Sequence, residues 1–203
     1  MDRETARPKR VYRQVARAQA AEVTAARILD AFESHLRELW YDEVTLDLVA
    51  RDAGVTVPTV LRRFGSKEGL LEALWQRLAD SVLGGRQARP GDVGDVVRAV
   101  VADYDRLGDL VLRILAQESR FPSFRQKADI GRTHHRGWVE RMFAAHLDAL
   151  PARARRQALD ALVVATDLYT WKLVRRDMGR SAADTRQVMA ALVEGALAVA
   201  AER

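Results

Sequence analysis

Residues 44–67, VTLDLVARDAGVTVPTVLRRFGSK, constrain the fold of this chain more than any other stretch. From Leu46 to Ala53 the apolar residues recur at i, i+3, i+4 and i+7, which is the spacing of one face of a short helix. Thr45 stands directly before that face, where a side-chain oxygen can cap the helix. Gly54 follows at once, and glycine readily adopts the left-handed conformation in which many helices end. We therefore expect a short helix that stops at a sharp glycine turn.

A second short helix is expected directly after this turn. Thr56 is placed to cap it, and Pro58 lies in its first turn, where a missing backbone N–H costs no hydrogen bond. Val60 and Phe64 lie one turn apart on its buried face. Two short helices about a tight turn form a helix-turn-helix, whose second helix lies in the major groove of DNA. The sequence therefore predicts a DNA-binding unit.

The segment AGVTVPTVLRRFGSKEGLL, residues 53–71, resembles the recognition segment of the TetR family of bacterial repressors. That family usually reads A-G-V-S-x-x-T-L-Y-x-H-F-x-S-K-E-x-L-L, and Val60 stands here where leucine is common. The matching positions are Ala53, Gly54, Val55, Thr59, Phe64, Ser66, Lys67, Glu68, Leu70 and Leu71. The resemblance implies a homodimeric transcription regulator, with repression as the default, that leaves a palindromic operator in double-stranded DNA when it binds a small-molecule effector.

Three positions depart from the family pattern. Leu61 stands where the family usually has a tyrosine, and Arg63 replaces a histidine that usually touches the DNA backbone. Asp47 is acidic, whereas relatives often carry a basic residue that contacts DNA, or a neutral residue, at this position. The operator sequence and the affinity of the relatives therefore do not transfer to this chain. These departures also leave open a second interpretation, a helical ligand-binding or protein-interaction module that has lost specific DNA binding.

The candidate DNA contacts divide into two groups. Those expected to face base edges and methyl groups are Val57, Pro58, Thr59, Leu61 and Arg62. Those expected to hold phosphates are Thr45, Thr56, Arg63 and Lys67. A cation at the start of a helix, as Lys67 is, opposes the helix dipole and fits better if a phosphate binds there.

Composition excludes several other classes of protein. The 203 residues include no cysteine, so disulfides and cysteine catalysis are ruled out. No phosphate loop, nucleophile elbow or H-E-x-x-H motif is present, and we expect neither an enzyme nor a cofactor. No apolar run approaches the roughly 18 residues of a membrane span, which predicts a soluble cytoplasmic protein without membrane contact. The net charge is +5, but residues 1–85 carry 13 basic and 13 acidic residues, so global charge does not locate a DNA surface.

The N-terminal 20 residues form a basic segment with Pro8 inside it, which we interpret as a flexible arm. It is either a solvated tail or a contact to the minor groove and flanking phosphates. The residues that would make that contact are Arg7, Lys9, Arg10 and Arg13. From residue 21 to 40 an apolar stripe predicts a long helix, with His35 off the stripe and without an expected role.

The rest of the chain also has helical patterns, so we predict an all-α fold of about nine helices. An N-terminal three-helix helix-turn-helix domain covers residues 21–65, and a C-terminal helical ligand-binding and dimerisation domain covers 66–203. Its first helix, 66–83, connects the two and ends at the glycine-rich break 84–91. The helical segments beyond the break are 92–107, 109–119 after Gly108, 123–150 as one long helix or a kinked pair, 151 to about 178, and 181–201.

The last two segments are the candidate dimer interface, because each has a broad apolar or small-residue face. The alternative is that these faces bury only against the core of their own subunit. The candidate interface residues are Leu162, Val163, Thr166, Thr170, Leu173, Val188, Leu192, Gly195 and Val199.

The middle helices carry the mixture of aromatic and polar residues typical of a pocket for an apolar or aromatic effector. The candidates are Trp75, Tyr104, Glu118, His135, Trp138, Met142 and Tyr169, and each could instead be plain core. We expect no metal site. His135 and His146 share a helix face but lie about 16 Å apart along it, and the adjacent His134 and His135 point in different directions.

Overall fold

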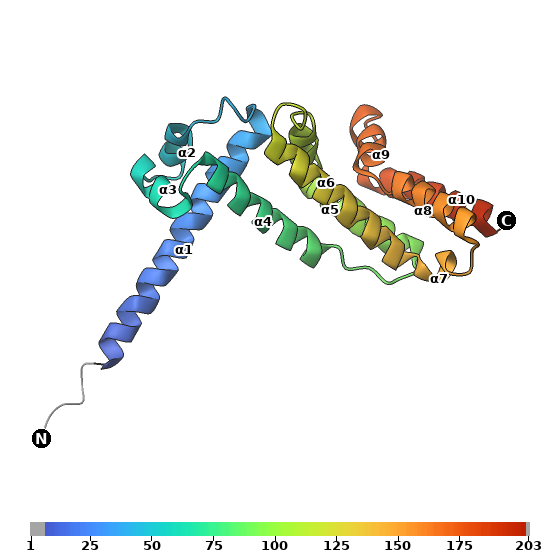
Figure 1. Ribbon diagram of the computed structural model, residues 1–203, viewed down its shortest axis with the longest axis horizontal. Helices are drawn as coiled ribbons and strands as arrows, with labels where there is room; N and C mark the ends of the chain where they lie inside the picture. The colour runs from blue at the N-terminus through green and yellow to red at the C-terminus, as the bar shows by residue number, and fades with distance from the viewer. Residues whose placement is uncertain (1–6, 202–203) are drawn as a thin grey trace, which may run out of the picture. The chain divides into compact units, whose positions relative to one another are not determined.

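The structure, a computed structural model, describes residues 7–201 of the chain, and all regular elements in that range are helical (Figure 1). The all-α fold predicted from the sequence is confirmed. The chain forms two compact units, Met1–Leu78 and Ala79–Arg203. The division falls inside the fourth helix, whereas the sequence placed the domain boundary before that helix. None of the helices in the described range combines the length and the hydropathy that a bilayer crossing requires.

The first unit holds a long helix, two short ones and most of a fourth. Their bounds are α1 Arg7–Glu38, α2 Leu46–Asp52, α3 Val57–Phe64 and α4 Lys67–Gly85. The fully buried side chains of this unit are contributed by all four helices, for example Phe32 of α1, Val49 of α2, Val60 of α3 and Leu74 of α4. The predicted apolar stripes of these helices therefore build one common core.

The N-terminal segment differs from its prediction. Residues 7–20, which we interpreted as part of a flexible arm, are the first turns of α1, while residues 1–6 lie outside the described residues. Two local reasons favour a helix here. Pro8 occupies the first turn, where it is tolerated, and alanines at 16, 18, 20 and 21 have the highest helix propensity. Residues 15–23 are exposed, so this part of α1 is held by propensity and by its continuity with the packed part.

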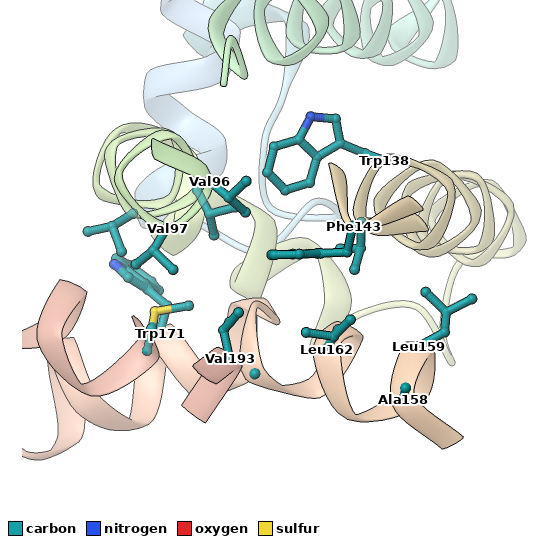
Figure 2. Close-up of a cluster of buried hydrophobic side chains, with 14 of the residues drawn as sticks. Val96, Val97, Trp138, Phe143, Ala158, Leu159, Leu162, Trp171 and Val193 are labelled. Atoms are coloured by element: carbon teal, nitrogen blue, oxygen red, sulfur yellow. The ribbon is translucent and has the colours of Figure 1, made fainter. Parts of the chain in front are cut away.

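The second unit is a bundle built on two long helices and a C-terminal hairpin. Its elements are α5 Val93–Leu115, α6 Pro122–Met142, α7 Ala144–Leu147, α8 Ala152–Ala165, α9 Leu168–Lys172, the π-helical η1 Leu173–Asp177 and α10 Ala182–Ala201. Helix α10 packs against both α8 and α5. Figure 2 shows the resulting core, with Val96 and Val97 from α5, Phe143 after α6, Leu162 from α8 and Val193 from α10.

Gly108 does not interrupt a helix, although the sequence suggested a break there. Helix α5 runs through it, and Gly108 faces the ring of Trp171, a side chain with no exposed surface. A Cβ at this position would lie 2.6 Å from the nearest ring atom. The glycine is therefore required by packing between α5 and α9 and not by a turn of the backbone.

The segment from 151 to 178, predicted as one helix, is broken after α8. Asp167 is extended, and its side chain accepts a hydrogen bond from the Tyr169 N–H at 2.8 Å, which caps the new helix α9. Beyond α9 the helix widens into the π-helical η1. For residues 123–150 the kinked pair was the correct alternative, because α6 ends at Met142 and α7 follows after Phe143.

Candidate nucleic-acid interface and effector region

The helix-turn-helix consists of α2, the Gly54 turn and α3. Thr45 Oγ1 accepts a hydrogen bond from the Leu48 N–H at 3.2 Å, which confirms the predicted cap. Gly54 has a φ of +63°, and the Val55 N–H that follows donates to the Ala50 carbonyl at 2.9 Å. A side chain is strained at this φ, so glycine allows the chain to reverse between the two helices.

Helix α3 has one buried and one open face. Val60 is fully buried and Phe64 is half-buried, as predicted, so the opposite face carries the candidate DNA contacts. Of these candidates, Thr45, Thr56, Pro58, Leu61, Arg62 and Arg63 are exposed, and Val57, Thr59 and Lys67 are half-buried. Leu61 keeps 40% of its surface exposed although it is apolar. Five of the six exposed candidates thus lie on α3 or at its N-cap, while Thr45 caps α2 and the half-buried Lys67 begins α4.

The first turn of α3 is organised by two threonines. Thr56 has the extended conformation of an N-cap residue, but its side chain makes no hydrogen bond to a helix N–H. Its hydroxyl lies 3.1 Å from the hydroxyl of Thr59. Because a hydroxyl both donates and accepts, this exposed pair retains the capacity to bind a phosphate oxygen.

The three cations near this face differ in their surroundings. Arg63 is paired with Glu22 of α1 at 2.5 Å, in a contact that water reaches on both sides. Lys67 Nζ lies 4.2 Å from the centre of the Tyr41 ring, and its pKa is lowered by burial, an effect that nearby carboxylates oppose. Arg62 has no ion-pair partner within the described part of the chain. Arg62 is thus the cation of α3 that can meet DNA without first giving up a partner.

Two side chains of α1 tie the helix-turn-helix to the long helix, and the sequence analysis missed both. Arg27 donates to the Ala53 carbonyl at 2.7 Å and to the Gly54 carbonyl at 3.3 Å. His35 Nε2 lies 2.9 Å from the Asp52 carboxylate, and only 14% of its side chain is exposed. The sequence predicted no role for His35 and did not predict this contact. His35 follows the buried Phe32 by three residues, which was an available signal, whereas the spacing did not single out Arg27.

Three of the predicted effector residues meet in the second unit around a side chain that the sequence did not single out. Arg86, directly after α4, donates to Asp103 at 2.9 Å and lies 3.1 Å from His135 Nδ1. Its guanidinium also lies over the rings of Tyr104 and Trp138, at 5.1 and 5.6 Å from their centres. The residues that form this Arg86 cluster are Arg86, Asp103, Tyr104, His135, Trp138 and Thr166.

Burial sets the protonation states in the Arg86 cluster. Desolvation, followed by the charge of Arg86, lowers the pKa of His135 to about 4, so this imidazole is neutral near pH 7. A guanidinium can only donate, so Nδ1 accepts and Nε2–H points to the Thr166 hydroxyl at 3.2 Å. Burial also raises the pKa of Tyr104 to about 12, and its hydroxyl donates to the Thr166 carbonyl at 3.2 Å.

The other predicted effector residues lie elsewhere. Glu118 binds Arg132 through both carboxylate oxygens at the surface, and Tyr169 is 55% exposed. Met142 is half-buried at the edge of the core. Trp75 belongs to the first unit, where its buried indole N–H has no hydrogen-bond partner among the described residues. The structure thus gathers Tyr104, His135 and Trp138 and separates them from Glu118 and Tyr169.

The predicted dimer residues divide by exposure. Leu162 and Thr166 have no exposed surface and belong to the core of their own subunit, so their assignment to an interface is wrong. Val163 and Thr170 are half-buried, and Gly195 is exposed. The exposed apolar side chains from α8 to α10 include four of the predicted residues, Leu173, Val188, Leu192 and Val199, and also Val164 and Met178, which were not predicted.

Comparison with known proteins confirms the resemblance that the sequence predicted. Residues 37–74, from the end of α1 to the middle of α4, match the family described as bacterial regulatory proteins, tetR family. No curated protein matches the chain. The matched range contains all of α2, the Gly54 turn and α3, which is the part that forms the helix-turn-helix.

Solved structures show the same fold. A transcriptional regulator from Rhodococcus sp. Rha1 is 14% identical, with a TM-score of 0.64, and the match covers 87% of this chain and 95% of that one. A TetR-family regulator from Rhodococcus sp. gives 16% identity, a TM-score of 0.63, and 86% and 98% coverage. A TetR transcription regulator from Haloarcula marismortui is 16% identical, with a TM-score of 0.57, and the match covers 85% of this chain and 97% of that one. The similarity extends over both units of the chain.

Proposed function

We propose that this chain, which carries the helix-turn-helix of the tetR family of bacterial regulatory proteins on a fold of the same kind, is a homodimeric repressor that releases a palindromic operator when it binds a small molecule. The observation that supports DNA binding most directly is the open face of α3. The exposed Leu61 and Arg62 follow directly after the buried Val60. An arginine and an apolar side chain are suited to guanine edges and thymine methyl groups, respectively.

Dimerisation is supported by the exposed side of α10. Val188, Leu192, Gly195 and Val199 follow one another at spacings of four, three and four residues. That is the spacing of a seam between packed helices, and Gly195 would allow two backbones to approach closely. Two copies related by a two-fold axis would present two recognition helices, and the operator would contain half-sites about 34 Å apart or a multiple of that distance.

Effector control requires a ligand that binds the two states of the protein differently. In this proposal the ligand binds in the second unit and shifts α4, the helix whose residues 67–78 belong to the first unit and 79–85 to the second. The shift changes the separation of the two recognition helices, so that both no longer fit successive major grooves.

Selection of bound sequences from a random duplex pool tests the DNA-binding part of the proposal. The expected result is an enriched palindrome with half-sites one helical turn, or a multiple of it, apart. A pool without enrichment, together with no salt-dependent binding to random duplex, would favour a module that has lost DNA binding. Asp47, an exposed acid in the first turn of α2, is the observation that keeps this second candidate open.

Arg62→Ala sharpens the same experiment. If Arg62 contacts a guanine edge, its removal should relax the preference at one base pair of each half-site by about 1–3 kcal/mol. Arg51→Ala is the matched control, because Arg51 is an exposed arginine of α2 that already pairs with Asp52. A uniform loss of affinity in Arg62→Ala, without a change in preference, would place Arg62 on a phosphate instead.

A further inference from the structure

The Arg86 cluster has the form of a binding site that already contains a ligand, the side chain of Arg86. Only 11% of this side chain is exposed, and it contacts one carboxylate, one imidazole and two aromatic rings. The rings of His135 and Trp138 stack, with their centres 6.4 Å apart, so these two sides of the site are packed against each other. Aromatic faces beside a carboxylate are the surroundings that stabilise an organic cation in proteins.

The polar atoms that face Arg86 are all acceptors. Asp103 Oδ2 and His135 Nδ1 accept hydrogen bonds from the guanidinium. The N–H and O–H groups of the two rings are directed away, to Thr166. A molecule in the place of the guanidinium must therefore donate hydrogen bonds and carry a positive charge, which excludes anions.

Asp103 needs a cation at this place. Its Oδ1 is paired with Arg106 at 2.7 Å, but the Arg106 side chain is 45% exposed and approaches from the other oxygen. The Asp103 side chain itself is only 4% exposed. If Arg86 withdrew, Oδ2 would be left buried without a partner, which is strongly unfavourable. A neutral apolar molecule could fill the space but could not satisfy this carboxylate.

Arg86 is also placed so that it can withdraw. It is the first residue after α4, and residues 86–89 have no regular secondary structure. Its N–H donates to the Val82 carbonyl at 3.0 Å, which joins it to the last turn of α4. The side chain can leave without the unfolding of a helix. Its departure removes one side-chain tie between the C-terminal end of α4 and α5, another being the 2.7 Å hydrogen bond from Arg106 to Ser81.

We propose that Asp103, Tyr104, His135 and Trp138 form the effector site of this protein and that the effector is an organic cation with N–H donors, such as a guanidinium or amidinium compound with an apolar body, which replaces Arg86. This inference rests on the proposed function, since it names the ligand class of that regulator. Arg86 then acts as a built-in competitor: the chain holds α4 in place with its own guanidinium until an external one takes the site.

The central test is Arg86→Ala in the full chain, titrated by calorimetry with ethylguanidinium and, separately, with its uncharged analogue N-ethylurea at equal ionic strength. Ethylguanidinium should bind Arg86→Ala at least about tenfold more tightly than it binds the wild type, because the tethered Arg86 competes at high effective concentration. N-ethylurea should show no gain. Equal binding of ethylguanidinium to both proteins, or an equal gain for N-ethylurea, would overturn the site.

Two variants serve as matched controls. Arg106→Ala removes the other partner of Asp103 but leaves the site filled by Arg86, so ethylguanidinium should not bind it more tightly. Arg86→Ala/Asp103→Asn removes both buried charges together, so it keeps the balance of charge but should lose the gain. A gain that persists in the double variant would mean that ethylguanidinium binds elsewhere.

A loss of stability in Arg86→Ala would not prevent the test. In that case the Tm of the variant is measured with increasing ethylguanidinium. A rise in Tm that N-ethylurea does not reproduce supports the site, since a ligand of the folded state stabilises it. A Tm that stays constant or falls with both compounds overturns it.

The effector role is tested separately with benzamidinium on the wild-type protein and the DNA recovered by selection. Benzamidinium should lower the affinity for that DNA, whereas the neutral benzamide should not. Binding of benzamidinium without a change in DNA affinity would overturn the effector role. A failed DNA selection would overturn the proposed function instead, and the ethylguanidinium titration, which needs no DNA, would still decide the ligand class.

Discussion

The cations of α3 and the cation of Arg86 lie in opposite environments. Arg62 is exposed and unpaired within the described residues, and Arg63 holds Glu22 in a pair open to water. Arg86, in contrast, is nearly enclosed and has several partners. An exposed cation exchanges its partner for a phosphate at little cost, whereas a buried one can be replaced only by another cation. This difference is the basis for our proposals of a DNA-binding surface in one unit and a ligand-operated switch in the other.

The largest expected effect comes from Asp103→Ala, which leaves Arg86 buried without its carboxylate. The free energy of unfolding should fall by about 3–5 kcal/mol, measured by urea denaturation. The control is Asp109→Ala, which removes a carboxylate paired with Arg176 but 57% exposed, and it should cost at most about 1 kcal/mol. Similar losses in the two variants would contradict the contrast between buried and exposed pairs.

The pH dependence of stability tests the same contrast through His135. Its pKa is about 4 in the folded protein against 6.5 when unfolded, so between these values only the unfolded state binds the proton. This histidine therefore reduces stability as the pH falls from 6.5 towards 4, by up to about 3 kcal/mol, and contributes no slope above that range. His135→Gln should flatten the profile by this amount, because glutamine keeps an acceptor for Arg86 and does not titrate. Parallel profiles of wild type and variant would show that His135 is not neutral and buried.

Gly108→Ala tests how closely the helices of the second unit fit. The new Cβ would meet the ring of Trp171 at 2.6 Å, and such overpacking costs about 1–3 kcal/mol. Gly131→Ala is the control, since Gly131 lies inside α6 with nothing within 4 Å of its Cβ position, and alanine there should add about 0.5–1 kcal/mol. Thermal denaturation of both variants measures the difference. A Gly108→Ala variant as stable as the wild type would mean that the Trp171 ring moves easily to make room for the new Cβ.

The smallest effect is expected for Glu22→Gln, which releases Arg63. Stability should change by less than about 1 kcal/mol, because the pair is exposed. If Arg63 then contacts a DNA phosphate, the slope of log affinity against log salt concentration should steepen by the amount expected for about one phosphate contact. Asp30→Asn is the control, since Asp30 lies on the same helix but pairs with Arg77 of α4. Equal salt slopes in wild type and Glu22→Gln would place Arg63 away from DNA.

The candidate DNA surface was largely predictable from the sequence, whereas the candidate effector site was predictable only in part. The aromatic members Tyr104 and Trp138 and the polar His135 were named from the mixture of aromatic and polar residues on the middle helices, and the structure brings them together. Arg86 was missed because it lies in the glycine- and proline-rich break, which had been interpreted only as the end of a helix. Asp103 was missed because an acid on a helix is usually a solvated charge.

The sequence by itself determined the all-helical fold and the shape of the helix-turn-helix. These depend on local rules: apolar spacing sets the buried side of α3, Thr45 caps α2, and Gly54 supplies the positive φ of the turn. Each acts within a few residues of the chain. A pattern read along the sequence therefore contains the needed information.

Only the tertiary structure decided which side chains meet across helices. Arg86 and His135 are 49 residues apart, Tyr104 and Thr166 are 62 apart, and Arg63 and Glu22 are 41 apart. It also placed Leu162 and Thr166 in the core, although the same apolar stripe could equally have faced a second subunit. The physical reason is that periodicity shows that a helix face is buried but not what buries it; packing of the whole chain makes that choice.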